Sequence, residues 1–195
     1  MKLTFNYLFL FITVSTLISC NDDITIANNT QQCDPTNTTF NKLYNTSVNT
    51  PNSTDKTSYD FKYHTYTFEV LKDNFVCKIG YEGAFHKNPY LIEIFDNTTN
   101  TTVYSGSHVF SATQTSYVDI PPVPVITGHS YTIIRFIEGS SEVGRCVSSS
   151  LRFPIVYGDL KITKSSRYQR EIDKIENTSA DDYSFIPYID IVFQN

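Results

Sequence analysis

The fold class follows from one stretch of the chain, Tyr131-Thr132-Ile133-Ile134-Arg135-Phe136-Ile137. Its β-branched and aromatic residues are the types that pack best on a pleated strand. Turn-forming residues enclose the stretch, with Thr127-Gly128-His129 before it and Gly139-Ser140-Ser141 after it. The stretch therefore predicts the strongest strand of the protein.

Further strand-like segments extend outward from this one at intervals of roughly 8–15 residues, separated by turn residues. One of them, 117–120, is expected to stop at Pro121-Pro122, because proline cannot continue a central strand. No long amphipathic helix lies between the segments, although 164–176 could hold a short helix or, equally, an ordered loop. The pattern predicts an all-β fold, a jelly-roll-like antiparallel β-sandwich of about eight strands over 59–195. The other predicted strands include 61–70, 75–81, 90–95, 102–106, 151–157 and 186–193.

The composition narrows the classes of function. The 195-residue chain has a formal net charge of −5 and a sequence pI of about 5.3, so it lacks the basic footprint that nucleic acid requires. Its 14 Tyr and 14 Phe, against one Met and no Trp, are typical of an aromatic-packed β protein. Neither a Gly-rich phosphate loop nor a Gly-X-Ser-X-Gly motif occurs, and we expect no enzyme activity.

The segment 1–19 has the features of a signal peptide. A lysine-bearing start leads into the apolar run Tyr7–Ile18, which is shorter than the roughly 18 residues of a membrane-spanning helix. The run ends in Leu17-Ile18-Ser19-Cys20, which resembles the lipobox of bacterial lipoproteins. The resemblance implies that the signal is removed and that Cys20 becomes the acylated N-terminus. An ordinary secretory signal is the alternative.

The residues after the lipobox, Asn21-Asp22-Asp23, resemble the acidic stretch of surface lipoproteins from Bacteroidetes-type bacteria. Two or three acyl chains would anchor the protein stably in a membrane. We therefore expect it in the bacterial cell envelope, in the outer membrane, with secretion as the alternative.

The segment 20–58 is rich in Asn, Thr, Ser and Gln, and its apolar residues are too sparse to offset the entropy of ordering the chain. It is expected to be the lipidated N-terminus followed by a flexible stalk. The patch Phe40-Asn41-Lys42-Leu43-Tyr44 could dock on the folded domain, which is expected to begin at residue 59.

Cysteines other than Cys20 are Cys33, Cys77 and Cys146, and their spacing matches no zinc motif. Cys77 alternates with Phe75 and Ile79, so a small buried hydrophobic residue is the simplest interpretation. A Cys77–Cys146 disulfide is the alternative, since both residues lie in predicted strands.

Several segments of the folded region resemble the strands of an uncharacterised β-sandwich family of secreted bacterial proteins, with the jelly-roll pattern of galactose-binding-type modules. They cover about two thirds of the chain. The resemblance implies an extracellular binding or accessory module and carries no catalytic residues. The matching segments are Tyr66–Val70, Ile79–Tyr81, Leu91–Asp96, Tyr117–Ile120, Thr127–Tyr131 and Pro187–Phe193.

Aromatic residues in two predicted loops are the candidates for ligand binding, because sugar sites combine an aromatic platform with a few polar groups. The absence of Trp argues against a strong platform, and burial in the core is the alternative for most Tyr and Phe residues. One loop is bracketed by Tyr81, Phe85, His86 and Tyr90, and the other contains Arg167, Tyr168 and Arg170.

Metal and catalytic sites have weaker support. Asp96, Asp119 and Asp159 lie near predicted strand ends and are candidates for a structural calcium ion, with solvated loops as the alternative. Glu138 and Glu142 would be the acidic pair of a glycan-processing hydrolase. The histidines His64, His86, His108 and His129 share no metal-ligand spacing.

Taken together, these features predict a lipid-anchored cell-envelope module that binds an extracellular ligand, with carbohydrate as the first class to test. Its expected partners are the membrane, through the lipid, and a glycan or surface protein. The alternatives are a structural or assembly subunit of an envelope complex and, less favoured, the hydrolase.

Overall fold

The computed structural model describes residues 32–59, 63–83, 89–137, 143–148, 152–166 and 185–194. These residues form one helix and twelve strands, so the strand number exceeds the predicted eight or so. In chain order the elements are α1 (Thr39–Val48), β1 (Thr54–Tyr59), β2 (Tyr63–Val70), β3 (Asn74–Tyr81), β4 (Tyr90–Asp96), β5 (Thr101–His108), β6 (Ser116–Val125), β7 (Ser130–Phe136), β8 (Val143–Ser148), β9 (Ile155–Tyr157), β10 (Leu160–Ser166), β11 (Phe185–Pro187) and β12 (Ile189–Phe193).

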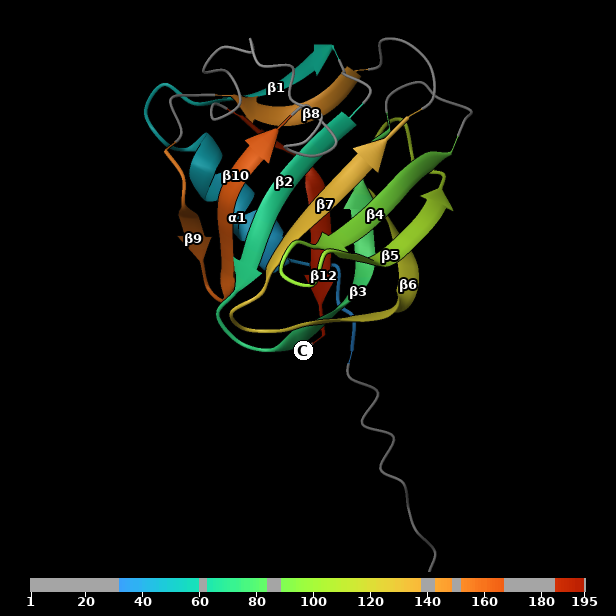
Figure 1. The fold of residues 1–195 in the computed structure, drawn as a ribbon. Coiled ribbons are helices and arrows are strands. Elements are labelled where there is room, and N and C mark those ends of the chain that lie inside the picture. The colour runs from blue at the N-terminus through green and yellow to red at the C-terminus, as the bar shows by residue number, and fades with distance from the viewer. Residues whose placement is uncertain are drawn as a thin grey trace, which may run out of the picture. The chain divides into compact units, whose positions relative to one another are not determined.

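Six strands form the front layer in Figure 1, in the order β5-β4-β7-β2-β10-β9, and all neighbours are antiparallel. The stretch that begins at Tyr131 is β7, which lies in the interior of this sheet between β4 and β2. The strand β10 was not predicted, although Leu160 and Ile162 alternate into the core. Of the segment 164–176, which could have held a short helix or an ordered loop, Lys164–Ser166 instead pair with β2, and residues 167–176 lie outside the described residues.

Two three-stranded antiparallel sheets complete the sandwich. The sheet β12-β3-β6 lies behind the front layer, and β1-β8-β11 lies at one end (Figure 1). The prediction that Pro121-Pro122 ends a strand is wrong, since β6 continues through both prolines. β6 is an edge strand, where missing N–H donors are tolerated, and its pairing with β3 shifts register between Val76 and Lys78.

A core of aromatic and aliphatic side chains lies between the layers. Tyr66 and Phe68 of β2 are fully buried, and the Tyr66 hydroxyl donates a 2.7 Å hydrogen bond to the Ile189 carbonyl of the opposite sheet. This bond satisfies the one polar group that the ring brings into the core. The predicted all-β antiparallel sandwich is confirmed.

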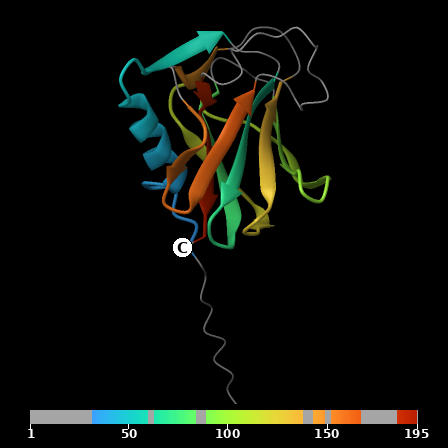
Figure 2. The ribbon, with the colours of Figure 1, turned by 60° about the vertical axis from the view of Figure 1, so that its left-hand side comes forward.

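The prediction that residues up to 58 form a flexible stalk is wrong for the described part, 32–58. Helix α1 packs beside β12 and β9 along one side of the sandwich (Figure 2). Its residues Phe40, Leu43 and Tyr44 are fully buried, and the Phe40 ring stacks on Tyr66 at 5.3 Å. Burial of these three large side chains offsets the entropy lost when the segment is ordered, although the polar composition had suggested that this entropy would keep it unfolded. Residues 20–31 lie outside the described residues.

Cys77 is buried as predicted, but a disulfide joins it to Cys33, so the predicted Cys77–Cys146 disulfide is wrong. The Cα atoms of the pair are 6.1 Å apart. Cys146 lies buried in β8, outside this disulfide. The expectation failed because the partner lies in the segment that was taken for a stalk. Among the described residues, no helix has the length and apolar character needed to cross a membrane.

Candidate functional site

The outer face of the sheet β12-β3-β6 carries a connected group of polar and aromatic side chains. Side chains alternate along a strand, so the burial of Ile79 and Tyr81 in the core turns Lys78 and Gly80 of β3 outward. We call this group, the partly or fully exposed Lys78, Tyr117 and Asp119 with the buried Gly80 and Asp190 that support them, the outer-face site.

Tyr117 lies flat across the middle strand of this sheet. Gly80 pairs with Tyr117 of β6 on one side and with Asp190 of β12 on the other. A Cβ atom at Gly80 would come within 2.4 Å of the Tyr117 ring, so only glycine leaves room for the ring. The Tyr117 hydroxyl reaches over it and donates a 2.8 Å hydrogen bond to the Asp190 carboxylate.

Asp190 is a fully buried carboxyl group beneath helix α1. Burial raises its pKa to about 7, although the hydrogen bonds from Thr38 and Tyr117 act in the opposite direction. The Thr38 hydroxyl lies 2.8 and 2.9 Å from the two carboxylate oxygens and also caps the helix by accepting from the Asn41 N–H. Because Asp190 is enclosed, it can bind a proton but cannot contact a ligand directly.

Helix α1 and β1 are tied to the sandwich by a second set of polar contacts. Asn41 donates a 3.1 Å hydrogen bond to the hydroxyl of buried Tyr188. The Arg145 guanidinium lies 4.5 Å from the centre of the Tyr188 ring and donates hydrogen bonds to both carboxylate oxygens of Asp55. Burial alone would raise the pKa of Asp55, but the hydrogen bonds from Arg145 and Tyr44 hold it below its usual range. These contacts fix the N-terminal segment beside the outer-face site.

Lys78 and Asp119 form an ion pair two positions along the same two strands from the Gly80–Tyr117 pair. The Asp119 side chain is 83% exposed and that of Lys78 is 20% exposed. A donor and an acceptor thus stand beside a half-buried aromatic ring, which is the combination that recognises sugar hydroxyls and the apolar face of a sugar ring.

The three candidate calcium ligands are not assembled into one site. Asp96 is buried at the end of β4, where it accepts hydrogen bonds from the Thr98 and Thr99 N–H groups of the following turn and lies 2.8 Å from His129 Nδ1. Burial would raise the pKa of Asp96, but the hydrogen bonds from His129 and the turn lower it. Asp119 pairs with Lys78, and Asp159 lies in the β9–β10 turn. Within the described ranges, no three His, Cys, Asp or Glu side chains cluster as a metal site.

The predicted ligand-binding residues Tyr81 and Tyr90 belong to the core, which corrects their assignment to a surface loop. They are 1% and 2% exposed, and their rings meet edge to face at 5.0 Å. The guanidinium of fully buried Arg135 lies 5.7 and 5.8 Å from the two ring centres. The other candidates, Phe85, His86, Arg167, Tyr168, Arg170, Glu138 and Glu142, lie outside the described residues.

A polar pocket of about 320 Å³ opens at the start of helix α1. Its Asp34 carboxylate accepts hydrogen bonds from the backbone N–H and the hydroxyl of Thr36, so it completes a local turn. The lining residues are Asp34, Thr36, Asn37, Thr38, Thr39, Lys42, Val192 and Phe193.

The sequence analysis considered Asp119 only as a metal ligand and did not single out Lys78, Tyr117 or Asp190 as site residues. The outward alternation of Tyr117 with Asp119 was the one available signal. The chain matches no protein-family model, and a search of curated proteins finds no match either. The outer-face site therefore has to be judged by its own geometry.

Proposed function

We propose that the protein is a lipid-anchored cell-envelope module whose β-sandwich binds an extracellular carbohydrate. The observation that carries the proposal is the Cys33–Cys77 disulfide, because such bonds persist in oxidising compartments outside the cytosol. The signal-like segment 1–19 and the lipobox ending at Cys20 point to the same address. Acylation of Cys20 would hold the domain at the membrane.

The outer-face site is the surface that we propose for the carbohydrate. The half-buried Tyr117 ring offers a stacking face, and its position is fixed from below by Gly80 and from one side by Asp190. A preformed platform avoids the entropy of ordering a side chain on binding. The neighbouring Lys78–Asp119 pair offers a donor and an acceptor to sugar hydroxyls.

The test is a glycan-array screen of the mature protein, followed by titration of any glycan that binds. We expect Tyr117→Ala to weaken saturable binding by about tenfold or more, because the stacking face is lost. Tyr117→Phe keeps the ring and removes only the hydroxyl, so it should bind within about threefold of the wild type. Thermal melts of both variants would show that they are folded.

A blank array from folded protein would contradict the carbohydrate proposal, as would equal binding by the wild type and Tyr117→Ala. Screening with calcium and with a chelator in parallel would reveal any requirement for a metal ion. Loss of binding with the chelator would add a calcium site to the proposal.

A second candidate is an assembly subunit of an envelope complex, which the edge strand β9 favours. Val156 and Tyr157 on this short strand are 51% and 38% exposed. An edge strand also presents unpaired backbone groups to another chain. Pull-down of stoichiometric envelope partners that Val156→Lys abolishes would favour this candidate over carbohydrate binding.

A further inference from the structure

We propose that one end of the sandwich, formed by Leu71, Phe75 and Ile126, rests on the lipid surface in which Cys20 is anchored. We call this group the apolar end. The inference rests on the proposed acylation of Cys20. It adds the orientation of the domain on the membrane and the surface by which the domain contacts the lipid.

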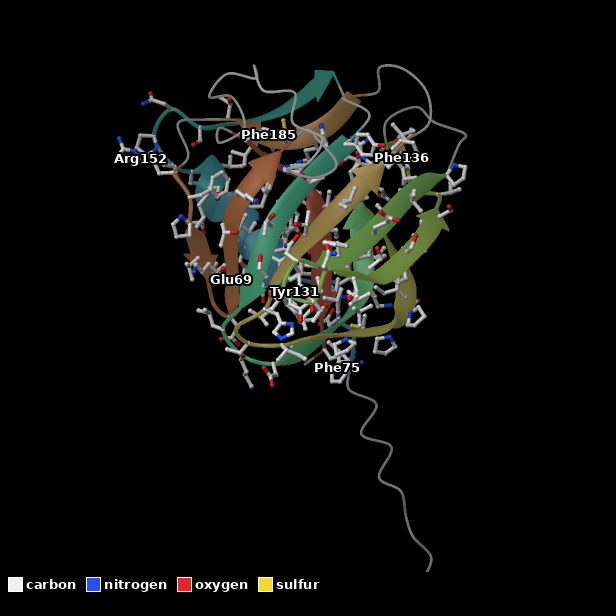
Figure 3. All side chains as sticks on the ribbon, viewed as in Figure 1. Glu69, Phe75, Tyr131, Phe136, Arg152 and Phe185 are labelled. Carbon is white, nitrogen blue, oxygen red and sulfur yellow. A yellow bond between two sulfur atoms is a disulfide. The ribbon has the colours of Figure 1, made fainter. Side chains whose placement is uncertain are left out.

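The three side chains belong to neighbouring turns and strand ends. Phe75 pairs with Pro124, which places the start of β3 beside the end of β6. The Thr127 N–H donates a 2.7 Å hydrogen bond to the Asp73 carboxylate, so the β6–β7 turn touches the β2–β3 turn. Figure 3 shows Phe75 at the tip of this end, away from Phe136 and Phe185.

Each of these three large apolar side chains is substantially exposed. Leu71 is 53% exposed, Phe75 is 41% exposed and Ile126 is 44% exposed. Together they make up three of the seven large hydrophobic residues exposed in the described part of the chain. Such a group marks a contact with an apolar partner, and the hydrocarbon boundary of a bilayer is one.

The path of the chain selects the lipid surface as that partner. The Cys33–Cys77 disulfide holds the first described residues beside β3, two positions along the chain from Phe75. Only eleven residues, 21–31, separate Cys20 from Gln32. Eleven residues can span at most about 40 Å. The apolar end is thus the part of the domain that an anchor at Cys20 would keep nearest to the bilayer.

The chain has no tryptophan, which allows a direct test with a single reporter. Full-length protein carrying Phe75→Trp would be produced in a host that acylates lipoproteins and reconstituted into phosphatidylethanolamine–phosphatidylglycerol vesicles with brominated acyl chains. The matched control is Val109→Trp. Val109 is 63% exposed and follows His108, which pairs with Tyr90 at the opposite end of β4 from the apolar end. Mass spectrometry of each sample would report acylation of Cys20.

We expect brominated lipid to quench the fluorescence of F75W at least about twofold more strongly than that of V109W, because bromine quenches only at close range. Equal quenching of the two variants, or no quenching in acylated protein, would overturn the lipid contact of the apolar end while leaving the acylation of Cys20 supported. Unacylated Cys20 would overturn both. A blue shift of the F75W emission that grows with protein concentration without vesicles would assign the apolar end to a second copy of the chain and overturn the lipid contact.

Discussion

Asp190 illustrates how a single residue can couple packing to proton binding. Its carboxyl group lies beneath helix α1, where it accepts hydrogen bonds from the Thr38 and Tyr117 hydroxyls. Two neutral donors do not replace the hydration that an ionised carboxylate loses on burial, so its pKa rises to about 7. The residue connects the helix to the ring that we propose as the carbohydrate platform.

The first prediction concerns the pH dependence of stability. Asp190 has a pKa of about 7 in the folded state, above the ordinary 3.8, so the folded state holds its proton more tightly than the unfolded state does. The free energy of unfolding should therefore fall as the pH rises, by about 2–3 kcal/mol from this group between pH 5 and pH 8. Asp190→Asn cannot titrate and should remove most of this fall.

Urea unfolding at several pH values would measure the effect. Asp119→Asn is the matched control, because Asp119 lies on the same face but is exposed, and it should keep the wild-type pH dependence. The same slope in Asp190→Asn as in the wild type would show that the buried carboxyl does not titrate in this range.

At the scale of elements, helix α1 and the disulfide make the N-terminal segment part of the sandwich. Phe40, Leu43 and Tyr44 fill the side of the core, and β1 pairs with β8 along six residue pairs. Cys33 adds a covalent link to β3, across 44 positions of sequence. A fragment beginning at residue 59 would lack helix α1, most of β1 and the Cys33–Cys77 disulfide, and it would expose the apolar surface beneath the helix.

The second prediction follows from the length of the loop that the disulfide closes. Cys33→Ser should lower the free energy of unfolding by about 2–4 kcal/mol, because the unfolded chain regains the conformational freedom of that loop. Chemical denaturation with and without a reductant would test this. The reductant should destabilise the wild type and leave the variant unchanged; equal sensitivity of the two proteins would argue against the Cys33–Cys77 pairing.

At the scale of the whole folded unit, residues 32–194, the two surfaces of interest lie on different parts of the sandwich. The apolar end lies beside the point where the described chain begins, at the start of β3, whereas Tyr117 pairs with Gly80, five positions beyond Phe75 along that strand. An anchor at the apolar end would leave the outer face free for a soluble ligand. The folded unit therefore provides separate surfaces for the proposed lipid and carbohydrate contacts.

The third prediction tests the anchor itself. Cys20→Ser should abolish incorporation of labelled fatty acid and move the protein from the membrane fraction to a soluble or unprocessed form, because the acylated side chain is removed. The same labelling on Cys146→Ser provides the control, since Cys146 is buried in β8 and should not affect acylation. Continued labelling of Cys20→Ser would show that Cys20 is not the acylated residue.

The sequence by itself determined strands such as β2, β4 and β7, because their residue pattern is a local property of neighbouring positions, but it missed β1 and β10. It was sufficient for β7, where β-branched residues predominate, and for the all-β class. The prediction from sequence failed where the effect of a residue depended on the position of its strand in the sheet. Pro121-Pro122 was expected to end a strand. The strand β6 continues through both prolines because it lies at a sheet edge, and the local sequence does not reveal which strand will be at an edge.

Only the tertiary structure decided which distant residues meet. Tyr117 and Asp190 are 73 positions apart and touch because β3 places Gly80 between them. Cys33 bonds to Cys77 and Phe40 stacks on Tyr66 because the N-terminal segment with helix α1 packs its apolar side chains against the sandwich. Sheet register and core packing involve the whole chain at once, so they set the candidate site, whereas local periodicity sets the strands that carry it.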